Sequence, residues 1–474
     1  MHLGILKKRS VALALCITFI VISVCSCSGT SNDVENGPDK ASTGVGSPET
    51  DNNASVKSDV PESVAQEKND IVAKQDESES DNAAAEQNET ESNNDAEKPD
   101  EPEENEVKDI VHIDDDTTGL EGAPAFVRKL RLGWNLGNTM DATNGATSGA
   151  NLNLEMSWSG AKTTPEMIKT IKDAGFKSVR IPVSWHNHVD RDLNIEVPWM
   201  ARVKTIVDYV IENDMYCIIN IHHDNMIGYY YPSSEYLEDS KNYVRRIWEQ
   251  VGEEFKDYDD HLIFESLNEP RLVGTANEWN LGNNDACKDA VACINELNQV
   301  FVDTIRAQGG NNADRYLLVP GYAAQWNAAV RDDFVIPNDA ADKKIMIEVH
   351  AYSPYNFALK SPDESGSTPY FSTVDNGSTS DINTMMLKLK LKFIDKGIGV
   401  VVDEFGSRDK GGNTEARAEH AGYYVKKARE FGITCFWWDN NCFEGEGERF
   451  GLLDRKNNAI RYPEIAQALV DNCR

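Results

Sequence analysis

The stretch Leu262-Ile263-Phe264-Glu265-Ser266-Leu267-Asn268-Glu269-Pro270 is a strand-like apolar run that ends at a carboxylate. A second run, residues 398–402, is followed by Asp403-Glu404-Phe405-Gly406. Glu269 and Glu404 are therefore predicted to lie where a buried strand meets a loop, which is the place where an α/β barrel carries its chemistry. We expect the two carboxyl groups to face each other at one end of such a barrel.

Short apolar runs recur with a steady rhythm on either side of these two. Together they span residues 129–136, 177–183, 216–222, 262–268, 316–320, 345–350, 398–404 and 433–438. Amphipathic helical patterns separate them, at residues 165–174, 199–213, 240–256, 289–308, 381–396 and 415–431, and a last one at 463–470 closes the chain. Alternating strands and helices predict a parallel sheet covered on both sides, and eight repeats predict a closed (β/α)8 TIM barrel of the α/β class.

The helical signal is strong in one connection and weak in another. The first helix has Thr164 as a capping residue and Pro165 at its first position, which are both strong start signals. The crossover between residues 320 and 345 has the weakest helical pattern, and we expect it to be irregular.

Polar side chains gather where the predicted strands end, and packing alone does not explain them. They are Arg180, His222, His223, Asn268, Glu269, His350, Tyr352, Glu404 and Trp438. The carboxyl ends of parallel strands meet at one rim of a barrel, so these side chains should lie close together. Two carboxyl groups there can divide the work of acetal hydrolysis, because one protonates the leaving oxygen while the other attacks the anomeric carbon.

Seven motifs in barrel order carry a resemblance to a known family. They are Gly-Trp-Asn-Leu-Gly-Asn-Thr at 133–139, Val-Arg-Ile-Pro-Val-Ser-Trp at 179–185, Ile-His-His at 221–223, Leu-Asn-Glu-Pro at 267–270, His-Ala-Tyr at 350–352, Asp-Glu-Phe-Gly at 403–406 and Trp-Asp-Asn at 438–440. The chain resembles glycoside hydrolase family 5, most closely the endo-β-1,4-glucanases of subfamily 4. The resemblance covers residues 119–474 and implies a retaining mechanism, with carboxyl groups about 5 to 5.5 Å apart.

The resemblance and the chemistry together give the two glutamates different roles. Glu269 is expected to be the general acid/base, beside Asn268, which should hold the sugar 2-hydroxyl. Glu404 is expected to be the nucleophile, kept ionised by Arg180 and by a hydrogen bond from Tyr352. The negative charge of Glu404 should raise the pKa of Glu269 and keep it protonated near neutral pH.

The remaining rim residues are expected to bind the sugar or to support the carboxylates. His222 and His350 should set the hydrogen-bond network around them, and Trp438 should offer a flat face to a pyranose ring. Weaker candidates for substrate binding are Asn138, Asp141, His223 and Trp326. Each also has a simpler interpretation, since a strand-end arginine can be a plain ion-pair partner and a tryptophan can be core.

No metal and no cofactor are expected. The sequence His222-His223-Asp224 suggests a metal site, but adjacent residues on a strand point to opposite sides and would not converge on one ion. Six cysteines lie after residue 118, and Cys287 and Cys293 are the nearest pair. Cys217 and Cys435 fall in predicted strands and should be small buried apolar residues, so no disulfide is predicted.

The first 27 residues have the pattern of an export signal. A basic segment at residues 7–9 precedes an apolar stretch at 11–24, which is short for a membrane span. The end resembles a bacterial lipoprotein box, with Cys27 the better candidate for lipidation and Cys25 the weaker one. The alternative is an uncleaved membrane anchor. Either interpretation predicts an exported catalytic domain. We expect a lipid anchor to hold it at the cell surface, and secretion is the alternative.

Residues 28–118 contain no Phe, Trp or Tyr, and carry 27 acidic against 6 basic side chains. Such a segment cannot bury enough apolar surface to offset its ordering entropy, so we predict a disordered acidic linker. Much of the net charge of −32 lies there. The acidic character argues against nucleic acid as a partner.

Three functional hypotheses follow. The first is a surface-tethered endo-β-1,4-glucanase with a monomeric catalytic domain that acts on soluble β-glucan. The second keeps the mechanism but places it on xyloglucan, mixed-linkage β-glucan, xylan or mannan. The third is a glycan-binding protein without catalysis, which would be favoured only if a carboxylate were missing. Both carboxylates are present.

Overall fold

The computed structural model of the chain describes residues 119–145, 147–445 and 447–473. The expected signal peptide (1–27, with Cys27) and the expected acidic linker (28–118) lie outside the described residues. Among the residues that are described, no helix is long and apolar enough to cross a membrane.

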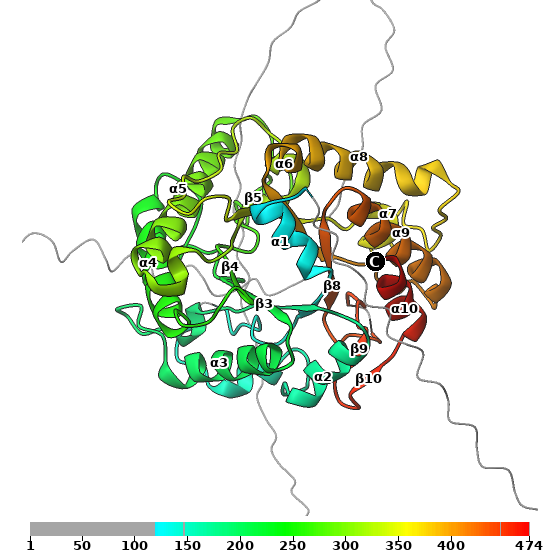
Figure 1. Ribbon diagram of the computed structural model, residues 1–474, viewed down its shortest axis with the longest axis horizontal. Coiled ribbons are helices and arrows are strands. Elements are labelled where there is room, and N and C mark those ends of the chain that lie inside the picture. Colours follow the sequence, from blue (N-terminus) through cyan, green and yellow to red (C-terminus); the bar gives the residue numbers. More distant parts are fainter. Residues whose placement is uncertain (1–118, 146, 446, 474) are drawn as a thin grey trace, which may run out of the picture. The chain divides into compact units, whose positions relative to one another are not determined.

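Eight parallel strands form a closed barrel in sequence order, and the first strand pairs with the last (Figure 1). They are β1 (Leu132–Leu136), β2 (Ser178–Ile181), β3 (Tyr216–Asn220), β4 (Leu262–Glu265), β5 (Leu317–Gln325), β6 (Ile345–His350), β7 (Gly399–Phe405) and β8 (Thr434–Asp439). The predicted TIM barrel is confirmed, with each predicted strand overlapping an observed one.

Helices surround the barrel (Figure 1). They are α1 (Gly122–Leu130), α2 (Pro165–Asp173), α3 (Val197–Glu212), α4 (Leu237–Glu254), α5 (Asp285–Ala307), α6 (Trp326–Ala329), α7 (Tyr355–Ala358), α8 (Asn376–Lys392), α9 (Thr414–Glu430) and α10 (Pro463–Asn472). Short 3₁₀ helices span Leu152–Met156, His186–His188, Gly310–Ala313 and Ile394–Lys396, and β9 (Leu453–Asp454) pairs with β10 (Ala459–Ile460). Thr164 caps α2 as expected, and the crossover after β5 holds only the four-residue helix α6.

The predicted start of the first strand is wrong. Residues 129 and 130 belong to α1, and the chain reverses at Arg131, which has a positive φ of 55°, before β1 begins. Phe126 on α1 stacks on Tyr316, with ring centroids 3.7 Å apart, and packs edge-on against Tyr216. Helix α1 therefore closes one end of the barrel with apolar side chains.

Above this apolar end, the interior of the barrel becomes polar. Four interior side chains cluster with α1, namely Ile218, Ile263, Met346 and Val401. Because side chains alternate along a strand, the residues two positions further on face the same interior. These are Asn220, Glu265, Glu348 and Asp403, and each is fully buried. The polar layer lies between the apolar end and the rim that carries the predicted site.

Register shifts shape the rim itself. The pairing of β6 with β7 shifts between Val349 and His350, and the next strand pair shifts between Val402 and Phe405. These irregularities set His350 opposite Glu404. Bulges of this kind re-aim side chains near active sites.

The close approach of β1 and β8 yields a prediction about stability. A Cβ atom added at Gly133 would lie 2.0 Å from Cδ1 of Phe436, which is buried in the barrel interior. Gly133→Ala should therefore destabilise the fold by roughly 1–3 kcal/mol through overpacking. The measurement is thermal and urea unfolding of the wild type and the variant.

Gly377→Ala is the control, since its nearest contact to an added Cβ is an ordinary 3.4 Å to the Asp375 carboxylate. We expect it to be neutral or slightly stabilising, because Ala is preferred over Gly within a helix. Equal stability of the two variants would contradict the proposed strand contact.

Candidate active site

The two predicted catalytic carboxylates share one histidine. Nδ1 of His350 lies 2.8 Å from Oε1 of Glu269 and 3.6 Å from Oε2 of Glu404. One oxygen of each glutamate and a nitrogen of His350 all lie within 4.8 Å of one another. The three groups, which were predicted to lie at strand ends, are therefore close together in the structure.

Glu404 is bound by the two groups expected from the sequence. The guanidinium NH1 of Arg180 donates to its Oε1 over 2.6 Å, and the Tyr352 hydroxyl donates to its Oε2 over 3.0 Å. The two donors fix the orientation of the carboxylate, and the bond from Arg180 has the short length of a strong charge-assisted hydrogen bond.

Arg180 uses all five of its N–H groups. Besides Glu404, it donates from Nε and NH2 to the two oxygens of Glu265, at 2.6 and 2.7 Å. It also donates to Oδ1 of Asn268 over 2.8 Å and to Oδ1 of Asn135 over 3.0 Å. Burial alone would lower the pKa of Arg180, but the surrounding carboxylates outweigh it and raise the pKa well above its usual value.

Sequence reasoning missed Glu265 and Asn135. Both lie inside strands whose residues are all buried. Alternation along the strand could have marked the residues that face the barrel interior, but a strand that is buried on both faces shows no such alternation in its sequence. Asn220 was missed for the same reason. Its amide donates to Oε1 of Glu265 over 2.7 Å, and so it fixes the carboxylate that fixes Arg180.

The expected pKa of Glu269 is wrong in direction. Burial does raise it, but the hydrogen bond and positive charge of His350 and the charge of Arg271 outweigh burial and lower the pKa to about 2. NH1 of Arg271 lies 3.5 Å from Oε2 of Glu269. Sequence reasoning counted the negative charge of Glu404 and omitted these two cations.

In the unliganded site the proton is therefore on His350. Burial lowers its pKa, but the charge of Glu404 and the hydrogen bond and charge of Glu269 outweigh burial and raise the pKa to about 9. The imidazolium donates from Nδ1 to Glu269, and its Nε2 lies 3.6 Å from Oδ1 of Asp403. The acid proton is thus stored one hydrogen bond away from the carboxylate that needs it.

His222 and Trp438 line the same rim. Their rings are parallel within 7°, with centroids 6.1 Å apart, and Nδ1 of His222 lies 3.0 Å from the Asn220 amide. Burial first, and then the charges of His223 and Arg180, hold the pKa of His222 well below its usual value. A Cβ atom at Gly137 would meet the Trp438 ring at 2.7 Å, so this glycine gives the indole its space.

The weaker substrate-binding candidates occupy different environments. Asp141 is fully buried, and its carboxylate accepts hydrogen bonds from the backbone N–H groups of Asn138 and Thr139, so it holds a loop rather than facing a sugar. His223 is partly exposed beside Trp158, an exposed aromatic that sequence reasoning missed. Trp326, at the start of α6, has the Lys388 ammonium over its ring.

The histidine pair does not lie on a strand, contrary to the expectation. Strand β3 ends at Asn220, so the alternation of a strand does not extend to His222 and His223. Their ring centroids lie 4.3 Å apart, and together with Asp141 they bring three possible ligand atoms within 4.8 Å of one another. The oxygens of Asp141 already accept two backbone hydrogen bonds, and the absence of a catalytic metal stays a prediction.

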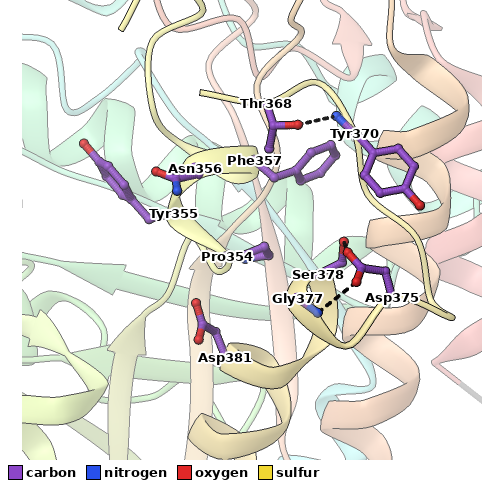
Figure 2. Close-up of a pocket in the computed structure, with 10 residues that line it drawn as sticks. All are labelled: Pro354, Tyr355, Asn356, Phe357, Thr368, Tyr370, Asp375, Gly377, Ser378 and Asp381. Atoms are coloured by element: carbon purple, nitrogen blue, oxygen red, sulfur yellow. Dashed lines mark hydrogen bonds between the residues drawn. The ribbon is translucent and has the colours of Figure 1, made fainter. Parts of the chain in front are cut away.

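A separate pocket lies on the loop after β6, only a few residues beyond Tyr352. Its volume is about 280 Å³, and Figure 2 shows it between α7 and the start of α8. Asp375 caps α8 by accepting a hydrogen bond from the N–H of Gly377, and the ring of Tyr370 is exposed. The residues that line this pocket include none of the expected catalytic groups.

Cys217 and Cys435 are buried in strands β3 and β8, as expected for small apolar residues.

Comparisons with known proteins agree with the sequence motifs. Residues 140–444 match the family model Cellulase (glycosyl hydrolase family 5). Endoglucanase B of Neocallimastix patriciarum is 42% identical over 350 residues, which are 73% of this chain and 70% of that protein. A family 5 lichenase from Caldicellulosiruptor sp. F32 is 54% identical with a TM-score of 0.74, over 75% of this chain and 96% of that one. A GH5-4 broad specificity endoglucanase from Ruminococcus champanellensis with bound cellotriose is 40% identical with a TM-score of 0.68, over 74% and 98%.

The proton on His350 can be tested directly. We expect the imidazole to stay charged to a pH of about 9, because its pKa is raised to that value. Glu269→Gln removes one of the negative charges that raise the pKa, so it should lower it toward the ordinary value of about 6.5. The measurement is an NMR titration of the imidazole nitrogens in both proteins. Titration of the wild-type ring near pH 6.5 would show that the proton is stored elsewhere.

Proposed function

This chain belongs to the cellulase family, glycosyl hydrolase family 5, and on that premise we propose that Glu404 is its nucleophile and Glu269 its acid/base. The enzyme is a glycoside hydrolase, an endo-β-1,4-glucanase, and family 5 enzymes retain the anomeric configuration. The observation that carries the proposal is the shared His350, with Glu269 and Glu404 oxygens within 4.8 Å of one another. That spacing suits a retaining enzyme, whose carboxyl groups are about 5–5.5 Å apart, and not an inverting one at about 6.5–9.5 Å.

In the first step, Glu404 forms a bond to the anomeric carbon and the glycosidic bond breaks. Arg180 and Tyr352 hold the Glu404 carboxylate in position to attack that carbon. The departing oxygen takes a proton from Glu269, which must therefore be protonated once substrate is bound. A bound sugar excludes water from the site, and desolvation disfavours the Glu269–His350 ion pair relative to the neutral acid and imidazole. The proton then moves from Nδ1 of His350 across 2.8 Å to Oε1 of Glu269.

In the second step, the glycosyl ester on Glu404 is hydrolysed. The Glu269 carboxylate, now without its proton, accepts one from the attacking water. The oxygen of that water bonds to the anomeric carbon, the bond to Glu404 breaks, and Arg180 again binds the free carboxylate. The proton on Glu269 can return to His350, and so the starting state is restored.

Two side chains are suited to hold the reacting sugar. Arg180 engages Oδ1 of Asn268, which turns the amide so that its N–H2 group is the one left for the sugar 2-hydroxyl. Trp438 supplies the flat apolar face for stacking. His222, His223 and Asn138 extend this surface, and Trp158 adds an aromatic next to His223.

The preferred substrate is proposed to be soluble β-1,4-glucan, cleaved internally. Mixed-linkage β-glucan is the second candidate, because the 54% identical structure is a lichenase. Xyloglucan, xylan and mannan remain alternatives. The Cys27 lipid anchor, the surface location and the monomeric catalytic domain are also part of the proposal, and they rest on the sequence pattern of residues 1–118 and on the barrel's enclosure of its own core.

Replacing the proposed nucleophile should remove formation of the glycosyl ester. Glu404→Ala should abolish hydrolysis of an activated aryl β-cellobioside and of β-glucan, because no group remains to form the ester. Added azide should restore cleavage of the aryl substrate and give the inverted α-glycosyl azide. The control is Glu253→Ala, an exposed glutamate on α4, which should behave as the wild type does. Wild-type-like turnover by Glu404→Ala without azide would reject the assignment.

Replacing the acid/base should give an effect that depends on the leaving group. Glu269→Ala should cut natural β-glucan roughly 10²–10⁴ times more slowly, the usual worth of general acid catalysis. A dinitrophenyl cellobioside needs no protonation, so it should still react in a fast burst, followed by slow hydrolysis of the ester. Pre-steady-state bursts and steady rates would be compared for both variants. A burst from Glu404→Ala, or equal losses on both substrates with Glu269→Ala, would reverse or remove the assigned roles.

A further inference from the structure

The polar layer beneath the site contains two carboxyl groups that the mechanism does not use. Glu348 on β6 and Asp403 on β7 are fully buried. None of their four carboxyl oxygens has a hydrogen-bond partner among the described residues. Buried polar groups are nearly always paired, and an isolated buried carboxylate is very costly, so these two groups need an explanation.

The nearby cation cannot satisfy them. Nε of Arg180 lies 3.7 Å from Oδ2 of Asp403, which is beyond hydrogen-bond distance. Arg180 has five N–H donors, and all five already bind Glu265, Glu404, Asn268 and Asn135. No donor of Arg180 is left for Asp403 or for Glu348.

The histidine offers little more. His350 gives its Nδ1 proton to Glu269, and its Nε2 is 3.6 Å from Oδ1 of Asp403, too long for a hydrogen bond. An oxygen of Glu348, an oxygen of Asp403 and a nitrogen of His350 lie within 4.8 Å of one another. The two carboxyl groups are therefore close to each other, and Asp403 is within ion-pair distance of both cations, yet neither cation donates a hydrogen bond to either group.

The charges of the layer point the same way. The groups that face Glu348 and Asp403 are Arg180 from β2, Glu265 from β4, His350 from β6 and Glu404 from β7. If all the carboxyl groups were ionised, three cations would face five negative charges. The cations are Arg180, the His350 imidazolium and Arg271, which lies beside Glu269. Removing charge from Glu348 and Asp403 is the least costly change, since each of the other three accepts a hydrogen bond from a cation.

We propose that Glu348 and Asp403 are held as neutral carboxylic acids that hydrogen-bond to each other, and that this pair is a positioning element of the active site. A neutral pair leaves the charge of Arg180 to Glu404 and the charge of His350 to Glu269. An ionised pair would draw both cations away from the catalytic carboxylates. The catalytic consequence rests on the roles proposed for Glu269 and Glu404, whereas the neutrality of the pair does not.

The pKa values support this geometry. Burial is the main cause that raises the pKa of both groups well above the usual range, and the charge of Glu265 adds to it. A raised pKa in the folded state stabilises the fold fully below the unfolded pKa of about 4, and this contribution is lost as the pH rises toward the folded pKa. The amide variants Glu348→Gln and Asp403→Asn have no such loss, so their melting temperature relative to the wild type should rise steadily above pH 4.

The direct test is infrared difference spectroscopy at pH 7. The wild type should show the carbonyl band of a protonated carboxylic acid, shifted in D2O, and the double amide variant should lack it. Metal analysis of the same wild-type sample gives the competing outcome, in which no acid band is seen and a bound divalent cation satisfies the four oxygens. Absence of the acid band from the wild type would overturn the proposal, whatever the activity of the protein.

Two further measurements test whether Asp403 is neutral beside the catalytic groups. If Asp403 were ionised, its charge would raise the pKa of His350. Asp403→Asn would then lower the pKa of His350 and would move both limbs of the kcat/KM pH profile to lower pH. The proposal expects neither change, in contrast to Glu269→Gln. Glu265→Gln is the matched control in the same layer, since it loses a charge bonded to Arg180, and it should lower the melting temperature by many degrees. A shift of the pH profile with Asp403→Asn would show that the pair is charged.

Discussion

The active site depends on one buried cation at the centre of the barrel. Arg180 joins β1, β4 and β7 through Asn135, Glu265 and Glu404, and it also fixes the amide of Asn268. Removing one partner of a buried charge typically costs several kcal/mol, so each contact restrains the others. The position of Glu404, the proposed nucleophile on β7, is therefore set by the packing of the whole barrel.

The distribution of protons follows from this arrangement. One cation is committed to Glu404 and Glu265, so the second cation, His350, is free to hold the proton that Glu269 requires. The neutral pair beneath them completes the balance, because an additional negative charge would compete for both. Exclusion of water by a bound sugar disfavours the charged Glu269–His350 pair, and the proton has only one hydrogen bond to cross.

Much of this could be predicted from the sequence. The strands and the rim residues follow from short apolar runs that end in polar groups, and the motif matches placed Arg180, Tyr352 and Glu404 together. Glu265, Glu348 and Asp403 could not be predicted, because strands buried on both faces show no alternation that separates barrel interior from helix-facing side. Helix α1 was missed because its last residues continue the apolar pattern of β1. The pKa of Glu269 was mispredicted because it depends on His350 and Arg271, which sequence spacing does not relate to it.

The central claim is that the carboxylate held by Arg180 makes the covalent bond. An activated 2-deoxy-2-fluoro cellobioside slows both steps, and its good leaving group lets the glycosyl ester accumulate on the enzyme. Proteolysis and mass spectrometry of the trapped enzyme then locate the sugar. The account predicts one label per protein on Glu404. A label on Glu269 or on another residue, or turnover of the fluorosugar with no covalent adduct, would contradict it.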